Sequence, residues 1–327
     1  MARAIEQTAI GGGPPGRLER DQRIKGMVCL TVGIAVFSIQ DLIIKLLSGD
    51  YPLHQAMVIR SVTAVQLLLL LVVLDGGVRS LASRRPGLLI VRGLIMFSAY
   101  MSYYLGLAAL PIATSVALYF TAPLFITMLS VLALGETVGP RRWAAVTVGF
   151  VGVVIMVRPG SQFFEWASLF PLFSGLAYAV SQIITRKLGE VERATTMTFY
   201  GNGVFLMGAV LLAAIFGTGD VATQEHPSIA FLVRGWVWPS TLDFMLMMAC
   251  GVVAAAGLTL LTQAYRVAPA NTVAPFEYSA LIWATIYGWL FWHEFPAATT
   301  WLGMAIIVGA GLYVLYRERR IAPPGRP

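Results

Sequence analysis

The stretch Leu110-Pro111-Ile112-Ala113-Thr114, read LPIAT, returns 158 residues later as APANT at 268–272. Several chemically distinct residues recur at this displacement, in pairs: Ala122 with Ala280, Thr127 with Thr285, Glu136 with Glu294, and Trp143 with Trp301. Agreement at Pro, Thr, Glu and Trp is hard to explain by shared hydrophobicity. Upstream, QDLIIKLL (40–47) can be laid on SQIITRKL (181–188) at a displacement of 141. The sequence therefore predicts an internal duplication.

The composition indicates a membrane protein. Hydrophobic residues make up 57% of the 327 residues, charged residues only 12%, and the mean hydropathy is +0.75. A soluble domain carries about 25% charged residues. Apolar stretches of roughly 17–25 residues, long enough to cross a bilayer as a helix, recur along the chain. We therefore expect an all-α membrane protein with many spans.

The apolar stretches predict ten transmembrane helices, at about 26–47, 54–74, 88–109, 112–134, 143–158, 166–187, 194–216, 242–264, 270–292 and 299–316. The duplication divides them into two five-helix repeats, 26–160 and 161–316, between a disordered basic tail (1–25) and a basic tail (317–327). Because five is odd, the second repeat should enter the membrane in the opposite orientation. Inverted repeats of this kind serve alternating access in transporters, with the substrate held between the halves.

The basic residues orient the chain. With the N-terminus inside, 18 of the 23 Lys and Arg residues fall in cytoplasmic segments, whereas outside loops keep only Arg158 and Arg234. This bias predicts a multi-pass protein of the bacterial inner membrane with both chain ends in the cytoplasm. It also explains the net charge of +7 without nucleic acid binding.

The stretch FSIQDLIIKLLSGDYP (37–52) places two opposite charges, Asp41 and Lys45, near the outer end of the first span. Asp41 should lie roughly 10 Å from that end, and Arg60 of the second span roughly 9 Å, at 1.5 Å per residue. An ion pair between Asp41 and Arg60 is then reasonable, as a structural clamp or as a contact with substrate or protons. Lys45 is shallower, and we expect it to snorkel to the interface.

Glu277 lies about seven residues inside the ninth span, between Phe276 and Tyr278, with no basic residue adjacent in the sequence. Burial disfavours the charged form of a carboxylate, so this side chain could exchange a proton near neutral pH or bind a substrate ammonium. The alternative is an architectural hydrogen bond to Asn271 or Tyr278. Arg92 lies at the cytoplasmic edge of the third span, where we expect it to snorkel rather than to bind substrate.

Aromatic side chains recur within the spans and would together suit a planar or amphiphilic substrate, although each could simply pack. We select as candidate binding residues Tyr104, Tyr119, Tyr278 and Trp283, together with Gln182 from the duplicated stretch 181–188. Pro123 and Pro275 should kink the fourth and ninth spans, because proline lacks a backbone N–H.

Two motifs in tandem carry a resemblance to a known family. TAPLFITMLSVLALGE (121–136) precedes Gly149 and Gly152, and APFEYSALIWATIYGWLFWHEFP (274–296) precedes WLGMAIIVGAGLYV (301–314). With Arg60, these motifs resemble the EamA family of the drug/metabolite transporter superfamily, over roughly residues 26–316. Asp41, Lys45, Arg60 and the FEY run resemble a bacterial subgroup that contains riboflavin and S-adenosylmethionine carriers. The resemblance implies a ten-helix carrier of small metabolites with a central cavity between its repeats.

We therefore expect a secondary active transporter of a small polar or amphiphilic metabolite, such as an amino acid or a nucleoside-like or flavin-like compound, with possible proton coupling. The alternatives are a lipid-handling flippase or a membrane scaffold. The sequence has no GxxxxGK[ST] nucleotide loop and only three histidines, so we expect no enzyme, catalytic residue, metal or cofactor. The expected partners are a small-molecule substrate and the lipid bilayer, with the chain as a monomer or homodimer.

Overall fold

The computed structural model describes residues 15–134, 139–162, 164–188, 192, 194–219, 226–267 and 274–321. Every regular element within these ranges is helical. The first half contains α1 (Pro15–Leu47), α2 (Leu53–Gly76), the 3-10 helix η3 (Val78–Leu81), α3 (Pro86–Ala109), α4 (Ile112–Tyr119), α5 (Ala122–Leu134) and α6 (Pro140–Val157). The second half contains η4 (Trp166–Ser168), α7 (Leu169–Leu188), α8 (Ala194–Phe216), α9 (Pro227–Val233), α10 (Thr241–Val267), η5 (Ala274–Ser279), α12 (Ala280–Trp292) and α13 (Ala298–Ile321).

The helix bounds reproduce the duplication that the sequence predicted. Helices α5 and α12 begin at residues 122 and 280 and end at 134 and 292, a displacement of 158 at both ends. Helices α1 and α7 end at residues 47 and 188, and α2 and α8 begin at 53 and 194, a displacement of 141. Most of the difference between the two displacements lies in the connection 217–240, which includes α9.

Helix packing follows the same symmetry. Helix α1 packs on α10 and its counterpart α7 packs on α3, while α2 packs on α10 and its counterpart α8 packs on α3. Two helix pairs, α2 with α8 and α6 with α13, consist of counterparts that pack on each other. Each of these contacts between the halves thus maps onto another of them or onto itself, as expected for two halves related by an approximate two-fold axis.

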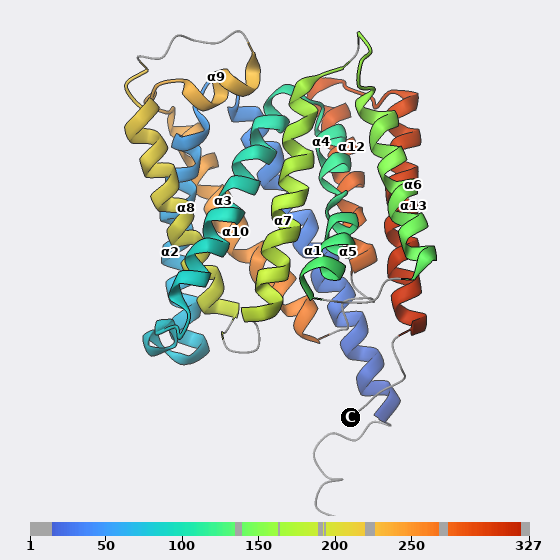
Figure 1. Ribbon diagram of the computed structural model, residues 1–327. Coiled ribbons are helices and arrows are strands. Elements are labelled where there is room, and N and C mark those ends of the chain that lie inside the picture. The colour runs from blue at the N-terminus through green and yellow to red at the C-terminus, as the bar shows by residue number, and fades with distance from the viewer. Residues whose placement is uncertain are drawn as a thin grey trace, which may run out of the picture.

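Figure 1 shows how the helices run between two faces of the bundle. We call the lower end, where α1 begins and α13 ends, the terminal face, and the upper end, where α9 lies, the opposite face. Helix α1 runs from the terminal face to the opposite face, whereas its counterpart α7 runs the other way (Figure 1). The two halves therefore run through the bundle in opposite directions.

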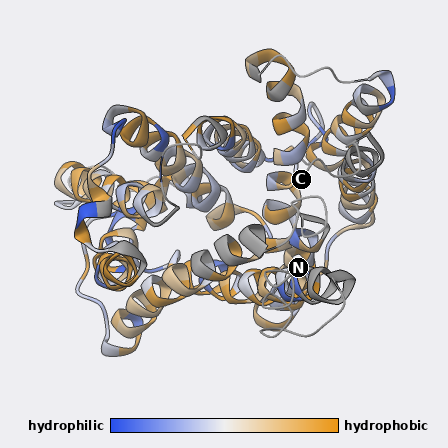
Figure 2. Cartoon of the chain, turned by 90° about the horizontal axis from the view of Figure 1, so that it is seen from below, coloured by the Kyte–Doolittle hydropathy of each residue, from blue (hydrophilic) through white to orange (hydrophobic). Residues whose placement is uncertain are grey.

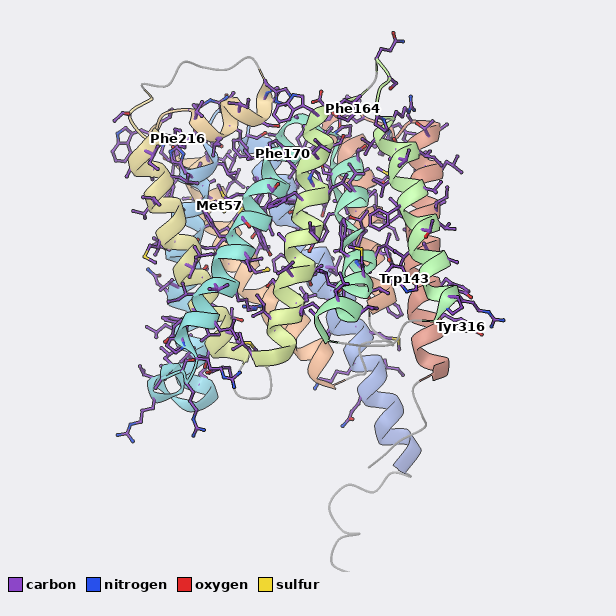
Figure 3. The ribbon with its side chains drawn as sticks, viewed as in Figure 1. Met57, Trp143, Phe164, Phe170, Phe216 and Tyr316 are labelled. Atoms are coloured by element: carbon purple, nitrogen blue, oxygen red, sulfur yellow. The ribbon has the colours of Figure 1, made fainter. Side chains whose placement is uncertain are left out.

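The outer surface of the bundle is apolar. Six helical stretches are long and apolar enough to cross a membrane, at Ile24–Leu47, Leu53–Leu74, Pro86–Ala109, Ile112–Ala133, Trp166–Thr185 and Thr196–Phe216. Large apolar side chains are exposed, among them Leu74, Leu132 and Met207, and Figure 2 shows apolar residues along the outer helices. In Figure 3, Phe164 and Phe216 lie near the opposite face and Trp143 and Tyr316 nearer the terminal face. The chain is a multi-pass membrane protein.

The structure differs from the expected spans at their ends. Helix α1 begins at Pro15, so residues 15–25 of the expected disordered tail are helical, and α13 continues to Ile321. Proline at the first helical position is preorganised for a helix and leaves no hydrogen bond unmade there. The charged residues that follow are compatible with a helix that extends past the bilayer.

The fourth expected span is interrupted between α4 and α5. Pro123 has no N–H to donate to the Tyr119 carbonyl. At the break, the Thr121 N–H donates to the Leu118 carbonyl at 3.2 Å, three residues back rather than the four of an α-helix. Helix α7 approaches this break through Gly175, where an added Cβ would lie 3.1 Å from the Tyr119 carbonyl oxygen. Pro275 lies in η5, so the corresponding part of the second half is a 3-10 turn rather than a kinked α-helix. Both interruptions face the candidate site.

Candidate functional site

Asp41 of α1 lies at the centre of a polar network between α1 and α3. The Tyr103 hydroxyl donates to Asp41 Oδ2 at 3.1 Å, and the Tyr104 hydroxyl donates to Oδ1 at 3.4 Å. Both tyrosines are buried, whereas Asp41 is only half-buried. The carboxylate is therefore held by buried hydroxyl groups, although Asp41 as a residue keeps some exposed surface.

Arg60 of α2 reaches the same network through Gln40. Arg60 Nε donates to Gln40 Oε1 at 2.9 Å, and Gln40 Nε2 donates to the Tyr104 hydroxyl oxygen. Because arginine can only donate, the Gln40 carbonyl must face Arg60 and its amide nitrogen must face Tyr104. The Tyr104 hydrogen is then left for Asp41. Arg60 thus orders a chain of hydrogen bonds that ends on Asp41.

This arrangement corrects the expected ion pair. Among the described residues, Asp41 and Arg60 do not form a direct salt bridge; they are connected through Gln40 and Tyr104. Gln40 lies one position before Asp41, so its side chain can fill the space between α1, α2 and α3. The matched depth of Asp41 and Arg60 was predicted, but not the neutral residue between them.

The Arg60 guanidinium has few protein partners for a buried cation. The residue is 6% exposed, and its Cζ atom lies 5.8 Å from the Tyr100 ring centroid and 5.9 Å from that of Phe205. Within the described part of the chain, its terminal nitrogens have no hydrogen-bond acceptor, since the bond to Gln40 uses Nε. Buried polar groups are normally paired. A planar or anionic group of a ligand would supply what is missing.

A run of tyrosines extends from this network across the interface between the halves. Ring centroids of Tyr103 and Tyr119 lie 5.5 Å apart, and those of Tyr119 and Tyr178 lie 5.6 Å apart. Tyr119 and Tyr178 are half-buried. We call Tyr103, Tyr119 and Tyr178 the tyrosine run. It offers edges, faces and hydroxyl groups to a flat substrate.

Glu277 of η5 lies at the far end of the tyrosine run. It is half-buried and lies within electrostatic range of Tyr119 and Tyr178. Gln182 of α7 interacts with the Tyr178 hydroxyl. The expected hydrogen bond from Glu277 to Asn271 concerns a residue outside the described ranges. The structure thus brings together Asp41, Arg60, Tyr104, Tyr119, Gln182 and Glu277, six of the eight candidates.

The rings of the other two candidates do not contact the tyrosine run. The Tyr278 ring packs on Phe120 at 4.9 Å, and its hydroxyl is buried against Gly311 of α13, with no hydrogen-bond partner among the described residues. Trp283 has a ring contact with Tyr287, 6.3 Å away along α12, and none with the tyrosine run. Sequence spacing fixed which helix carries these rings but not which neighbour each ring faces.

Lys45 does not snorkel, contrary to expectation. It is 8% exposed, donates to the Leu110 carbonyl oxygen and lies 3.8 Å from the Glu294 carboxylate. Its Nζ atom also lies 5.2 Å from the Trp292 ring centroid. The α3–α4 connection and the end of α12 supply these partners inside the protein, so Lys45 has no need of the membrane interface. The group joins the two halves near the opposite face.

Arg92 of α3 also turns inward. Its Nε atom donates to Thr185 Oγ1 of α7 at 2.7 Å, and Nη1 donates to the Met197 carbonyl of α8 at 3.4 Å. Expected to snorkel, it instead connects three helices. The sequence reasoning missed Arg92, Gln40 and Phe205 as parts of the site, and their only sequence signal is polarity, or a ring, within an apolar span.

The side chains of the site are suited to binding a ligand. Asp41 can bind a cationic group, Arg60 an anionic or flat one, and the tyrosines a ring. In the described ranges, no three His, Cys, Asp or Glu side chains are grouped as metal ligands. Cys250 of α10, a free thiol that is 2% exposed, lies within electrostatic range of Arg60 and Asp41.

The chain is similar to known proteins that are named as transporters. A riboflavin transporter of Rhizobium johnstonii is 35% identical over 244 residues, which cover 75% of this chain and 75% of the relative. A riboflavin transporter of Vibrio cholerae is 30% identical, covering 90% of this chain and 95% of the relative. An S-adenosylmethionine uptake transporter of Rickettsia prowazekii is 28% identical, covering 75% of this chain and 76% of the relative.

A solved crystal structure with 20% identity shares the fold, with a TM-score of 0.61 over 91% of this chain and 98% of the other. The model of the EamA-like transporter family matches twice, at residues 24–158 and 165–317. These two matches coincide with the two halves of the helical bundle. The chain belongs to the EamA-like transporter family.

Proposed function

We propose that the protein is a secondary active transporter that moves a small polar or amphiphilic metabolite across the bacterial inner membrane by alternating access. The proposal includes ten crossings, which would be made by the six long stretches, the shorter apolar helices Trp143–Val157, Thr241–Gly257 and Ala298–Tyr313, and α12. The opposite directions of α1 and α7 support an inverted arrangement of the two halves. The terminal face is cytoplasmic in this proposal, because Arg79, Arg84 and Arg85 lie in the connection at that end.

The observation that carries the proposal is the Arg60 guanidinium. A cation that is 6% exposed, with no acceptor for its terminal nitrogens among the described residues, is a candidate contact for an anionic or oxygen-rich group of a ligand. Asp41 and the tyrosine run lie within the same polar network and suit a substrate that combines charged groups with a flat ring. Aromatic amino acids and charged nucleoside-like compounds meet this description, and flavin-like compounds offer a flat ring together with polar oxygens. Related proteins named as riboflavin and S-adenosylmethionine transporters support the same class.

Counterflow in proteoliposomes tests the proposal. Vesicles that contain the purified protein and unlabelled riboflavin or S-adenosylmethionine should accumulate the same labelled compound transiently from outside. Vesicles with Arg60→Gln protein should not, although the variant folds. If metabolites of neither class exchange while a fluorescent lipid redistributes between leaflets, the flippase alternative is supported. A protein that does neither is better explained as a scaffold.

A further inference from the structure

Arg92 mirrors Arg60 in depth. Arg60 lies seven residues after the start of α2 at Leu53, about 10 Å from the opposite face, at 1.5 Å per residue. Arg92 lies six residues after the start of α3 at Pro86, about 9 Å from the terminal face by the same rise. The two arginines are therefore placed at equal depth from opposite ends of the bundle.

The internal duplication relates the surroundings of the two arginines, although the two residues are not counterparts of each other in the sequence. A displacement of 141 sets Arg60 of α2 opposite Gly201 of α8, and a displacement of 158 sets Arg92 of α3 opposite Cys250 of α10. In the structure, Arg92 Nη1 lies 3.9 Å from where a Cβ on Gly201 would be, and Cys250 lies within electrostatic range of Arg60. Each arginine thus lies beside the counterpart of the other. Each guanidinium therefore lies between a pair of helices that corresponds to the other pair, α2 with α10 for Arg60 and α8 with α3 for Arg92.

The neighbours of the two arginines are alike. Arg60 is hydrogen-bonded to the amide of Gln40, which is hydrogen-bonded to Tyr104. Arg92 lies within electrostatic range of Tyr178, which interacts with the amide of Gln182. The same displacement of 141 sets Gln182 opposite Asp41, and Glu277 near Tyr178 provides the carboxylate on this side. Each half of the site therefore holds one guanidinium, one amide, one carboxylate and tyrosine hydroxyls.

Arg92 retains donors for a ligand. Thr185 uses Nε and Met197 uses Nη1, and no acceptor for Nη2 lies among the described residues. The side chain is half-buried, so it is held inside the bundle while part of it stays accessible.

We propose that Arg92 is a second substrate-binding residue, which contacts the anionic or oxygen-rich end of the substrate when the site opens to the terminal face, as Arg60 does from the opposite face. This inference rests on the proposed transport function. An inverted repeat exchanges its two faces during alternating access, so a substrate that is bound by one arginine is released past the other. The path then has two equivalent cationic contacts, one for each direction of access.

Sidedness tests this inference. Half-saturating concentrations of S-adenosylmethionine, which carries a carboxylate, and of riboflavin are measured in right-side-out and inside-out membrane vesicles. Arg92→Gln should shift the ratio of the values from the two faces about tenfold, by weakening binding from the terminal face. Arg60→Lys should shift the ratio in the other direction, and Arg92→Lys should recover part of the wild-type ratio.

Arg84→Gln is the matched control, because it makes the same substitution at an exposed arginine of the terminal face. It should leave the ratio within about twofold of the wild type. An equal change from both faces with Arg92→Gln, no change, or the same shift with Arg84→Gln would overturn the inference. Absence of exchange by the wild type would instead refute the proposed function, so the two failures are distinguishable.

Discussion

Lys45 and Arg60 are two buried cations at the opposite-face half of the bundle, with exposures of 8% and 6%, yet their surroundings differ. Lys45 has a backbone carbonyl, the Glu294 carboxylate and the Trp292 ring. Arg60 has one neutral amide and two rings, and none of the described carboxylates is in salt-bridge contact with it. A cation whose donors find acceptors within the protein holds helices together. A cation with donors to spare is available to a ligand, and burial alone does not distinguish the two.

Arg60→Gln should have the largest effect on transport. The loss of a charged group that binds substrate should lower the transport rate about a hundredfold or more, since each tenfold corresponds to ~1.4 kcal/mol. Initial uptake rates in proteoliposomes, normalised to the amount of folded protein by size-exclusion chromatography, check this. Wild-type rates in the variant would show that Arg60 only holds helices together, as Lys45 does, and that the two cations do not differ in role.

Glu277→Gln should abolish transport or separate it from the proton gradient without loss of folding. The variant keeps the shape of the side chain but cannot release a proton, and Glu277 lies beside Tyr119 and Tyr178 at the far end of the run. Uptake between pH 5.5 and 8, with and without an imposed gradient, measures the coupling. Unchanged uptake with an unchanged pH dependence would leave Glu277 with an architectural role.

Lys45→Met should change stability more than transport. The variant removes the bond to Leu110 and leaves Glu294 without its cation, but Glu294 is 37% exposed, so the loss should be only about 1 kcal/mol. Thermal unfolding in detergent measures it, and Glu294→Gln in addition should restore part of the stability. A large loss of substrate affinity at normal stability would place Lys45 with Arg60 instead.

Tyr278→Phe should have the smallest effect. The hydroxyl is buried against Gly311 with no hydrogen-bond partner among the described residues, so its removal should change stability by less than about 1 kcal/mol. Uptake should stay within about twofold of the wild type. A much larger loss of uptake would mean that the hydroxyl meets the substrate in another conformation, as the sequence alone had suggested.

The sequence predicted the helical class, the duplication and the helix bounds to within a few residues for most spans, because hydrophobic length and repeated Pro, Thr and Trp positions are local signals. It also predicted that Asp41 and Arg60 lie at one depth. It did not predict Gln40 between them, because a neutral amide in an apolar span carries no charge signal.

The wrong expectations for Lys45 and Arg92 have one cause. Depth along a helix follows from residue count, but the direction a side chain takes depends on acceptors supplied by distant segments. Leu110 and Glu294 supply these for Lys45, and Thr185 and Met197 for Arg92. Tertiary packing decides the direction of both side chains, and a local sequence pattern does not predict it.

The alkylation rate of Cys250 provides a chemical probe of the space beside the candidate site. The chain has only one other cysteine, Cys29 in α1, so a Cys29→Ser variant would carry a single thiol, within electrostatic range of Arg60 and Asp41. Because that thiol is 2% exposed, a small alkylating reagent should reach it only in conformations that open the space around it. The alkylation rate would then report how often the bundle opens beside the site, without a radiolabel and before any substrate is known.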